Sequence, residues 1–184
     1  MTVRVAVVDA NVLYSIELTD LLLTLATHRL VRVHWSDTIL EEVRRNLALR
    51  PDLSSVAIDY RIDRMNLALA DARQGPPSGE LIESMPINAK DRHVLALAVH
   101  VEADCVVTFD LGDFPAALCE PYGLEPLHPD ELLDALAVNE PERVAVALVE
   151  MAARRRRPPM TPTQLLDRLE LTIPKFVARC RPPL

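Results

Sequence analysis

The stretch VRVAVVDANVL, residues 3–13, determines the type of fold that the rest of the sequence follows. Val3–Val8 is a mostly β-branched run with one arginine near its start, which is typical of a parallel strand buried on both faces. Asp9 ends this run, and leucines at helical spacing follow from Asn11 onward. A buried strand that ends in an acid and leads directly into a helix is a unit of an α/β fold.

Strand and helix patterns alternate along the rest of the chain. Short apolar runs predict strands at Val31–Trp35, Asp104–Asp110 and Leu124–Leu127, and a weaker one at Leu81–Ile87. Helical spacing predicts helices between and after them, at 11–28, from Ser36 to Arg50, from Asp52 or Ser54 to about Arg73, and at 89–102, 129–138 and 141–155. Residues 161–180 are expected to form one or two short helices that break near Pro174. This alternation predicts an α/β fold with a largely parallel central sheet.

The composition indicates one domain of ordinary size plus an extension. The 184 residues are 49% hydrophobic, which is enough for a substantial core. The net charge of −7 is unevenly distributed, because residues 151–184 carry +6 and leave −13 for the first 150 residues. The basic tail, with Arg154, Arg155, Arg156 and Arg157 in a row, could bind RNA phosphates or could lie on the acidic body or in a dimer contact.

The N-terminus and the cysteines suggest no secretion and no structural metal. The first apolar run is short, meets Asp9 and lacks a small-residue cleavage site, and no apolar run approaches the roughly 20 residues that cross a bilayer. We therefore expect a cytoplasmic protein without a membrane partner. The three cysteines form no CxxC pair, so neither a zinc site nor a disulfide framework is indicated.

Four acids fall where an open α/β sheet places its ligands, outside the carboxyl ends of the strands. Asp9 ends the first predicted strand, and Asp110 ends the last clear one. Helix geometry places Glu42 beside the apolar arc of its helix and turns Glu41 toward water. Asp91 lies in the first turn of the helix predicted at 89–102, near the middle of the buried arc of that helix.

Each acid alone has a simpler explanation. Asp91 could cap its helix, Glu42 could pair with an arginine on the helix surface, and Asp9 could be an ordinary loop residue. Asp110 or Asp113 could organise a turn. Together, however, the acids would repel one another, and the sequence places no lysine or arginine to neutralise them.

A hard divalent cation would remove this repulsion. Mg²⁺ and Mn²⁺ prefer carboxylate and water oxygens, so the acids predict a metal-dependent phosphoryl-transfer or hydrolysis site. His93 and His100 fall on the wetter side of their predicted helix, and we expect neither to be a ligand.

Four segments in this order, VVDANVL, SDTILEEVRRNL, KDRHVLALAV and VVTFDLGDFP, resemble the PIN-domain family of ribonucleases. More narrowly, they are similar to the VapC-type toxins of bacterial toxin–antitoxin pairs. The resemblance covers roughly residues 1–128 and implies a three-layer α/β/α nuclease domain. Residues 129–184 would then be a helical C-terminal extension with a basic linker at 154–162.

The resemblance also implies roles for individual residues. The catalytic acids would be Asp9, Glu42, Asp91 and Asp110, the metal ligands Asp9, Asp91, Asp110 and Asp113, and the supporting residues Asn11 and Thr108. Between Asp110 and Asp113, we expect Asp110 to contact the metal because it ends the predicted strand. The implied activity is Mg²⁺- or Mn²⁺-dependent cleavage of a structured RNA by a homodimer that a cognate antitoxin inhibits.

The sequence argues against two other enzyme classes and leaves two other functions open. A phosphatase of the haloacid dehalogenase type would need an acid where Asn11 stands, and a response-regulator receiver would need a lysine after a late strand, where neither Lys90 nor Lys175 lies. A PIN nuclease that processes RNA without being a toxin, or a catalytically silent PIN-like binding module, would keep the same sheet.

Overall fold

The computed structural model describes residues 3–156 and 158–181 and contains one five-stranded, all-parallel sheet. The order across the sheet is β3-β2-β1-β4-β5. The strands are β1 (Arg4–Val8), β2 (Val31–Ser36), β3 (Arg73–Gln74), β4 (Cys105–Val107) and β5 (Glu125–Leu127). The predicted α/β fold with a parallel central sheet is therefore confirmed.

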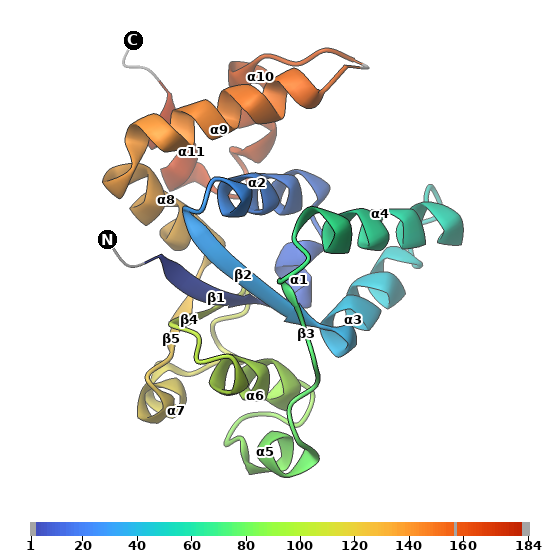
Figure 1. The fold of residues 1–184 in the computed structure, drawn as a ribbon, viewed down its shortest axis with the longest axis vertical. Coiled ribbons are helices and arrows are strands. Elements are labelled where there is room, and N and C mark those ends of the chain that lie inside the picture. The colour runs from blue at the N-terminus through green and yellow to red at the C-terminus, as the bar shows by residue number, and fades with distance from the viewer. Residues whose placement is uncertain (1–2, 157, 182–184) are drawn as a thin grey trace.

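Helices cover both faces of this sheet (Figure 1). They are α1 (Ala10–Leu13), α2 (Ile16–Thr27), α3 (Asp37–Leu47), α4 (Ser55–Ala68), α5 (Gly79–Ser84), α6 (Arg92–His100), α7 (Ala116–Cys119), α8 (Pro129–Asn139), α9 (Pro141–Arg154), α10 (Pro162–Leu169) and α11 (Pro174–Cys180), with a 3₁₀ turn, η1, at Glu120–Tyr122. In the part of the chain that the structure describes, no helix has both the length and the apolar character to span a membrane.

Water is excluded from the centre of the sheet because the central strand β1 and its neighbour β4 carry apolar side chains on both faces. Ala6, Val7 and Val8 of β1 are fully buried, and so is every residue of β4. Four helices start where the sequence provides a serine, whose hydroxyl accepts the backbone N–H three residues later. These N-caps are Ser15 of α2, Ser36 of α3, Ser54 of α4 and Ser78 of α5.

Two predicted elements were wrong. The expected strand at Leu81–Ile87 is instead α5, which the Ser78 cap starts. The helix expected to run to about Arg73 ends at Ala68, because the chain turns to the sheet and the Ala72 carbonyl accepts the Trp35 N–H at 3.0 Å. This contact starts β3, a two-residue edge strand that no sequence pattern predicts.

The strand expected at Asp104–Asp110 is also shorter than predicted. β4 ends at Val107, so Asp110 lies in the loop that follows. The strand ends there because the hydroxyl of Thr108 accepts the backbone N–H of Asp110 at 3.1 Å, which turns the chain away from the sheet.

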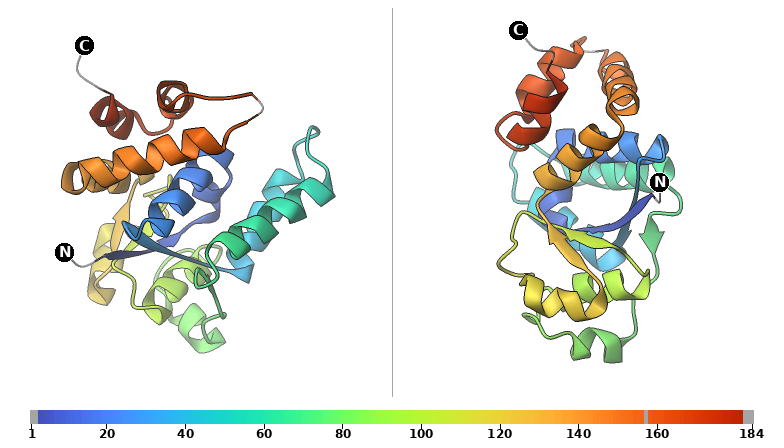
Figure 2. Two further views of the ribbon diagram at one scale, coloured as in Figure 1. Left: turned by 45° about the horizontal axis from the view of Figure 1, so that its top comes forward. Right: turned by 90° about the vertical axis from the view of Figure 1, so that its left-hand side faces the viewer.

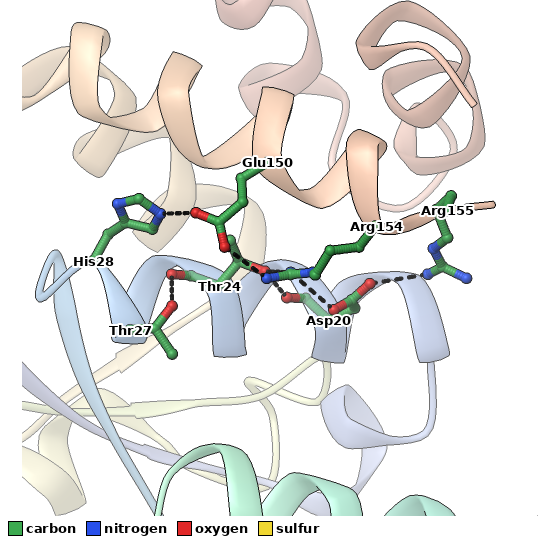
Figure 3. A network of polar contacts seen from close by, with 7 residues as sticks. All are labelled: Asp20, Thr24, Thr27, His28, Glu150, Arg154 and Arg155. Atoms are coloured by element: carbon green, nitrogen blue, oxygen red, sulfur yellow. Dashed lines mark hydrogen bonds and ion pairs between the residues drawn. The ribbon is translucent and has the colours of Figure 1, made fainter. Parts of the chain in front are cut away.

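The C-terminal helices α8–α11 lie on the side of the sheet that α2 covers, as both views in Figure 2 show. Ion pairs hold α9 to α2 (Figure 3): Arg154 and Arg155 both contact Asp20, and Glu150 contacts His28. Arg154 and Arg155 therefore lie on the acidic body of the protein, which is one of the roles considered above for the basic tail. Arg156 is exposed, and Arg157 lies outside the described residues.

Asp130 of α8 fastens the last helix. Its side chain is buried, and its two carboxylate oxygens accept the backbone N–H groups of Lys175 at 3.0 Å and Phe176 at 2.9 Å. These N–H groups belong to the first turn of α11, where no partner within the helix exists. A carboxylate from another helix therefore caps α11 and fixes the end of the extension.

We predict that Asp130→Ala destabilises the protein by about 1–3 kcal/mol, because it orphans these two N–H groups of α11. Asp134→Ala on the same helix is the control, since Asp134 makes an ion pair with Arg179 whose arginine side chain is 46% exposed. An exposed pair of this kind contributes about 0.2–1 kcal/mol. Urea unfolding of both variants checks the prediction, and equal losses would contradict it.

Candidate functional site

Asp9 is the fixed point of the candidate site. It directly follows β1, is only 8% exposed, and is tied to β4 because its N–H donates to the Val107 carbonyl at 3.0 Å. One carboxylate oxygen accepts the Ala10 N–H at 2.7 Å, and the other accepts the Thr108 hydroxyl at 2.8 Å. The carboxylate therefore has one orientation, facing the carboxyl edge of the sheet.

Thr108 and Asn11 hold this arrangement from the other side. Thr108 is fully buried, and its hydroxyl oxygen accepts the Asn11 side-chain N–H at 2.9 Å while it donates to Asp9. Asn11 in turn accepts the backbone N–H of Phe109 at 3.2 Å. The loop after β4 and the loop after β1 are thus one hydrogen-bonded unit around Asp9.

Asp91 comes to the same edge from the start of α6. It does not use its side chain to cap the helix, so the simple capping role considered for it is not what the structure shows. Its Oδ2 atom is buried and has no hydrogen-bond partner. Burial, and secondarily the charge of Asp113, raise the pKa of Asp91 above its usual range.

Lys90 lies between Asp91 and Asp113. Its ammonium donates to Asp113 Oδ2 at 2.8 Å and lies 3.6 Å from Asp91 Oδ2. The expectation that no cation is placed among the acids was therefore wrong. Helical periodicity does not predict the direction of the Lys90 side chain, because Lys90 precedes α6 and belongs to the turn that leads into it.

Glu42 reaches the site from α3, while its neighbour Glu41 does not. The Glu41 side chain is 61% exposed and pairs with Arg44 at 2.5 Å, whereas the Glu42 side chain is 28% exposed and contacts His93 Nε2 at 3.1 Å. The sequence analysis placed His93 on the wetter side of its helix, because it considered only the packing of that helix on the sheet and not the contact with α3. The ring lies where α3 meets the first turn of α6.

Asp110 lies in the loop that follows β4. It is exposed, and its recorded contacts use the backbone: its N–H donates to Thr108, and its carbonyl accepts the Asp113 N–H at 3.0 Å. The structure thus groups Asp9, Asp91 and Asp113 with Glu42 and leaves Asp110 at the rim. After burial, which is the largest cause in each case, the charge of Glu42 contributes to the raised pKa of Asp9, and the charges of Asp113 and Asp9 contribute to the raised pKa of Asp91, which reflects this proximity.

The donor set suits a hard divalent cation. Burial raises the pKa of Asp9, so a cation would stabilise its carboxylate, and Asp91 presents a buried oxygen without a hydrogen-bond partner. Within residues 3–156 and 158–181, no three acidic, histidine or cysteine side chains already surround one point closely enough to hold an ion. Mg²⁺ commonly uses one or two carboxylates and completes its coordination with water, which these residues allow.

We predict that Asp91→Asn raises the Tm of the metal-free protein by a few degrees at neutral pH. The folded-state pKa of Asp91 lies above its unfolded value, so its contribution to stability is present below the unfolded pKa and is lost as the pH rises through the folded pKa. The gain from the substitution should therefore shrink as the pH is lowered toward 4, the range of an ordinary aspartate.

Thermal unfolding between pH 4 and pH 8, with EDTA present, measures this difference. Asp63→Asn on α4 is the control, because Asp63 is exposed. A Tm difference for Asp91→Asn that stays constant across this range, or that grows at low pH, would show that the charge of Asp91 costs the fold nothing.

Comparison with known proteins matches two parts of the chain. Residues 5–112 match the family described as "PIN domain", and residues 129–182 match the family described as "VapC50 C-terminal domain". A protein of Mycobacterium tuberculosis (strain ATCC 25618 / H37Rv), named "Putative ribonuclease VapC50", is 44% identical over 103 residues. That stretch is 55% of this chain and 60% of the relative, and no solved structure matches the chain.

The PIN match covers more than half of the chain and includes Asp9, Glu42, Asp91 and Asp110, while Asp113 lies one residue beyond its end. The second match covers the helices that dock on α2. The chain therefore belongs to the PIN domain family and joins its PIN domain to a VapC50-type C-terminal domain.

Proposed function

We propose that this protein is a metal-dependent endoribonuclease that hydrolyses phosphodiester bonds in a structured RNA, and that it is the toxin of a toxin–antitoxin pair. The observation that carries the proposal is the cluster of carboxyl groups at the carboxyl edge of the sheet, in which a buried oxygen of Asp91 has no partner. The similarity to a protein whose name includes ribonuclease supports the choice of RNA as the substrate.

In this proposal Asp9 and Asp91 are the principal metal ligands. Asp9 is suited to the role because two hydrogen bonds fix its carboxylate before any ion arrives. Mg²⁺ or Mn²⁺, when bound, would supply an activated water and stabilise the leaving oxygen of the phosphodiester. Glu42 would orient or deprotonate the attacking water, since it faces the site from the opposite helix.

The third ligand is proposed from the geometry of the loop. Asp113 and Asp110 are both candidates, and Asp113 is favoured because it lies beside Asp91 and shares Lys90 with it. The preference for Asp110 depended on a strand that reached residue 110, and β4 ends at Val107. Asp110 then completes the coordination from the rim or contacts the substrate.

The division of the chain follows the same proposal. Residues 1–128 would form the nuclease domain, and residues 129–184 the helical extension, with the basic linker at 154–162. Since Arg154 and Arg155 are paired with Asp20, RNA binding by the four arginines would require these two to leave α2. We also propose that the protein forms a homodimer.

A groove between α2 and α4 supports a protein partner. It has a volume of about 600 Å³ and a mainly apolar floor that includes Leu23, Leu53 and Ile58. Five arginines also line it: Arg50, Arg61, Arg64, Arg154 and Arg155. Arg61 is partly buried and donates to the backbone carbonyls of Leu13 and Tyr14. A lining that is both apolar and basic suits an amphipathic helix with acidic flanks, which is the chemistry we propose for the antitoxin.

Cleavage of total bacterial RNA by the purified protein tests the nuclease proposal. We expect discrete fragments with Mg²⁺ or Mn²⁺ and none with EDTA, and no cleavage by Asp9→Ala or Asp91→Ala, because each removes a ligand. Glu42→Gln should lower the rate by about 10²–10⁴-fold, the usual contribution of a general base. Glu41→Gln is the matched control and should cleave at the wild-type rate.

The outcomes separate the alternatives. Wild-type cleavage by Asp9→Ala or Asp91→Ala would refute the assigned site, and a larger loss for Glu41→Gln than for Glu42→Gln would refute the assignment on α3. An intact RNA pool in every lane, from protein free of any bound partner, would favour a silent binding module. Specific cleavage without growth arrest on expression would favour an RNA-processing nuclease over a toxin.

A second experiment tests the antitoxin groove. Tyr60 lines the groove and is 66% exposed, whereas Leu67 on the same helix is 71% exposed and lies outside the groove. With the purified product of the adjacent upstream gene, we expect Tyr60→Glu to weaken binding at least about tenfold, as the loss of an aromatic anchor does. Leu67→Glu should bind like the wild type, and equal affinities in isothermal titration would exclude this groove.

A further inference from the structure

We propose that His93 is a positioning residue that holds the Glu42 carboxylate in its working orientation through a hydrogen bond. This inference rests on the proposed nuclease function. It goes beyond that function because it assigns a role to a histidine that stands outside the acidic set.

The contact joins two separate elements of the fold. His93 lies in the first turn of α6, Glu42 lies on α3, and the two residues are 51 positions apart in the chain. Their side chains are 13% and 28% exposed, so the contact is largely shielded from water. Among the hydrogen bonds of the described residues, the one that involves the Glu42 side chain is this contact at 3.1 Å.

The arginines of α3 do not perform this task. Arg44 lies two residues after Glu42 and therefore on the other side of the helix, where its guanidinium contacts Glu41 and Asp59. The inner carboxylate is thereby left to the imidazole of α6. A planar ring on a short stem fixes a carboxylate more closely than a long, flexible cation does.

The surroundings of the ring also decide which nitrogen carries the proton. A carboxylate oxygen can only accept, so the contact requires an N–H on Nε2. The other nitrogen, Nδ1, is buried and has no partner. A proton there would be an orphaned buried donor, which is costly, so the structure assigns the ring a proton on Nε2 and a bare Nδ1.

The location of the pair connects it to the acidic cluster. Glu42 lies close enough to Asp9 for its charge to contribute, after burial, to the raised pKa of Asp9. His93 also follows Asp91 by two residues on the same turn. A shift of α6 relative to α3 would therefore separate Glu42 from its donor and displace Asp91 together, so the hydrogen bond fixes the catalytic base relative to the metal ligands.

Two isosteric substitutions test the role. His93→Gln places its amide N–H near the position of Nε2, and His93→Asn places it near that of Nδ1, so only the glutamine can donate to Glu42. We expect His93→Gln to retain most of the wild-type kcat. His93→Asn should lose about 10–100-fold in kcat, the usual cost of removing a residue that orients a site group, with KM for RNA unchanged.

The Glu42→Gln background shows whether His93 acts through Glu42. If it does, adding His93→Asn to Glu42→Gln causes no further loss, because the carboxylate that His93 would position is already absent. Additive losses in the double variant, or equal kcat values for the Gln and Asn variants, would overturn the inference. Thermal unfolding of each variant shows that the proteins compared are folded.

A measurement without RNA separates this inference from the proposed function. Long-range ¹H–¹⁵N spectra of the metal-free protein report which ring nitrogen of each histidine is protonated. We expect His93 to show a proton on Nε2 in the wild type and to lose this single form in Glu42→Leu, with the exposed His100 as an internal reference. A proton on Nδ1, or a spectrum unchanged by Glu42→Leu, would overturn the pairing even if the protein cleaves RNA, and the expected spectrum would support it even if no cleavage is found.

Discussion

The carboxylate of Asp9, buried at the end of the central strand, is the constraint on which the rest of the candidate site depends. β1 lies between β2 and β4, so its end cannot move without disturbing two ladders of backbone hydrogen bonds. The N–H of Asp9 extends the second ladder by one bond, and Thr108 holds the side chain. Because the anchor is backbone pairing in a dry sheet, the position of the acid is as rigid as the core itself.

This rigidity has an energetic cost that the remainder of the molecule offsets. Burial raises the pKa of both Asp9 and Asp91, which means that each carboxylate is less stable in the fold than in water. Lys90 relieves part of the repulsion between Asp91 and Asp113, but its side chain is 66% exposed and its effect is screened by solvent. The buried strands and the helices docked on α2 supply the stability that the site lacks, as is common where function requires grouped charges.

The main elements of the fold could be predicted from sequence, and their contacts could not. The apolar runs at β1, β2 and β5 and the serine caps of α3 and α4 are local signals, and local signals suffice to start strands and helices. The helix expected at 11–28 is instead two helices, α1 and α2, because Ser15 caps a new start at Ile16. β3 has two residues and forms only because Ala72 meets Trp35, so it has no pattern of its own. The end of β4 depends on the hydroxyl of Thr108, which turns a run of strand-forming residues into a loop.

The candidate site divides in the same way. Strand ends and helix phasing were enough to bring Asp9, Glu42 and Asp91 toward one edge, because both follow from backbone periodicity. Periodicity predicts which face of a helix packs on the sheet. It does not predict which side chains contact a neighbouring helix, such as α3 beside α6. His93 and Lys90 were missed for this reason: one faces α3, and the other precedes the first residue of α6.

The position of Asp20 links the two parts of the chain. This residue holds Arg154 and Arg155 at the end of α9, and all three side chains also line the groove between α2 and α4. An acidic group that enters the groove competes with Asp20 for the same two guanidinium groups. Occupancy of the groove by such a group would therefore weaken the contacts of α9 with Asp20, and by thermodynamic linkage those contacts would weaken its binding by the same factor. The C-terminal domain would in this way act on the affinity of a groove that lies between α2 and α4.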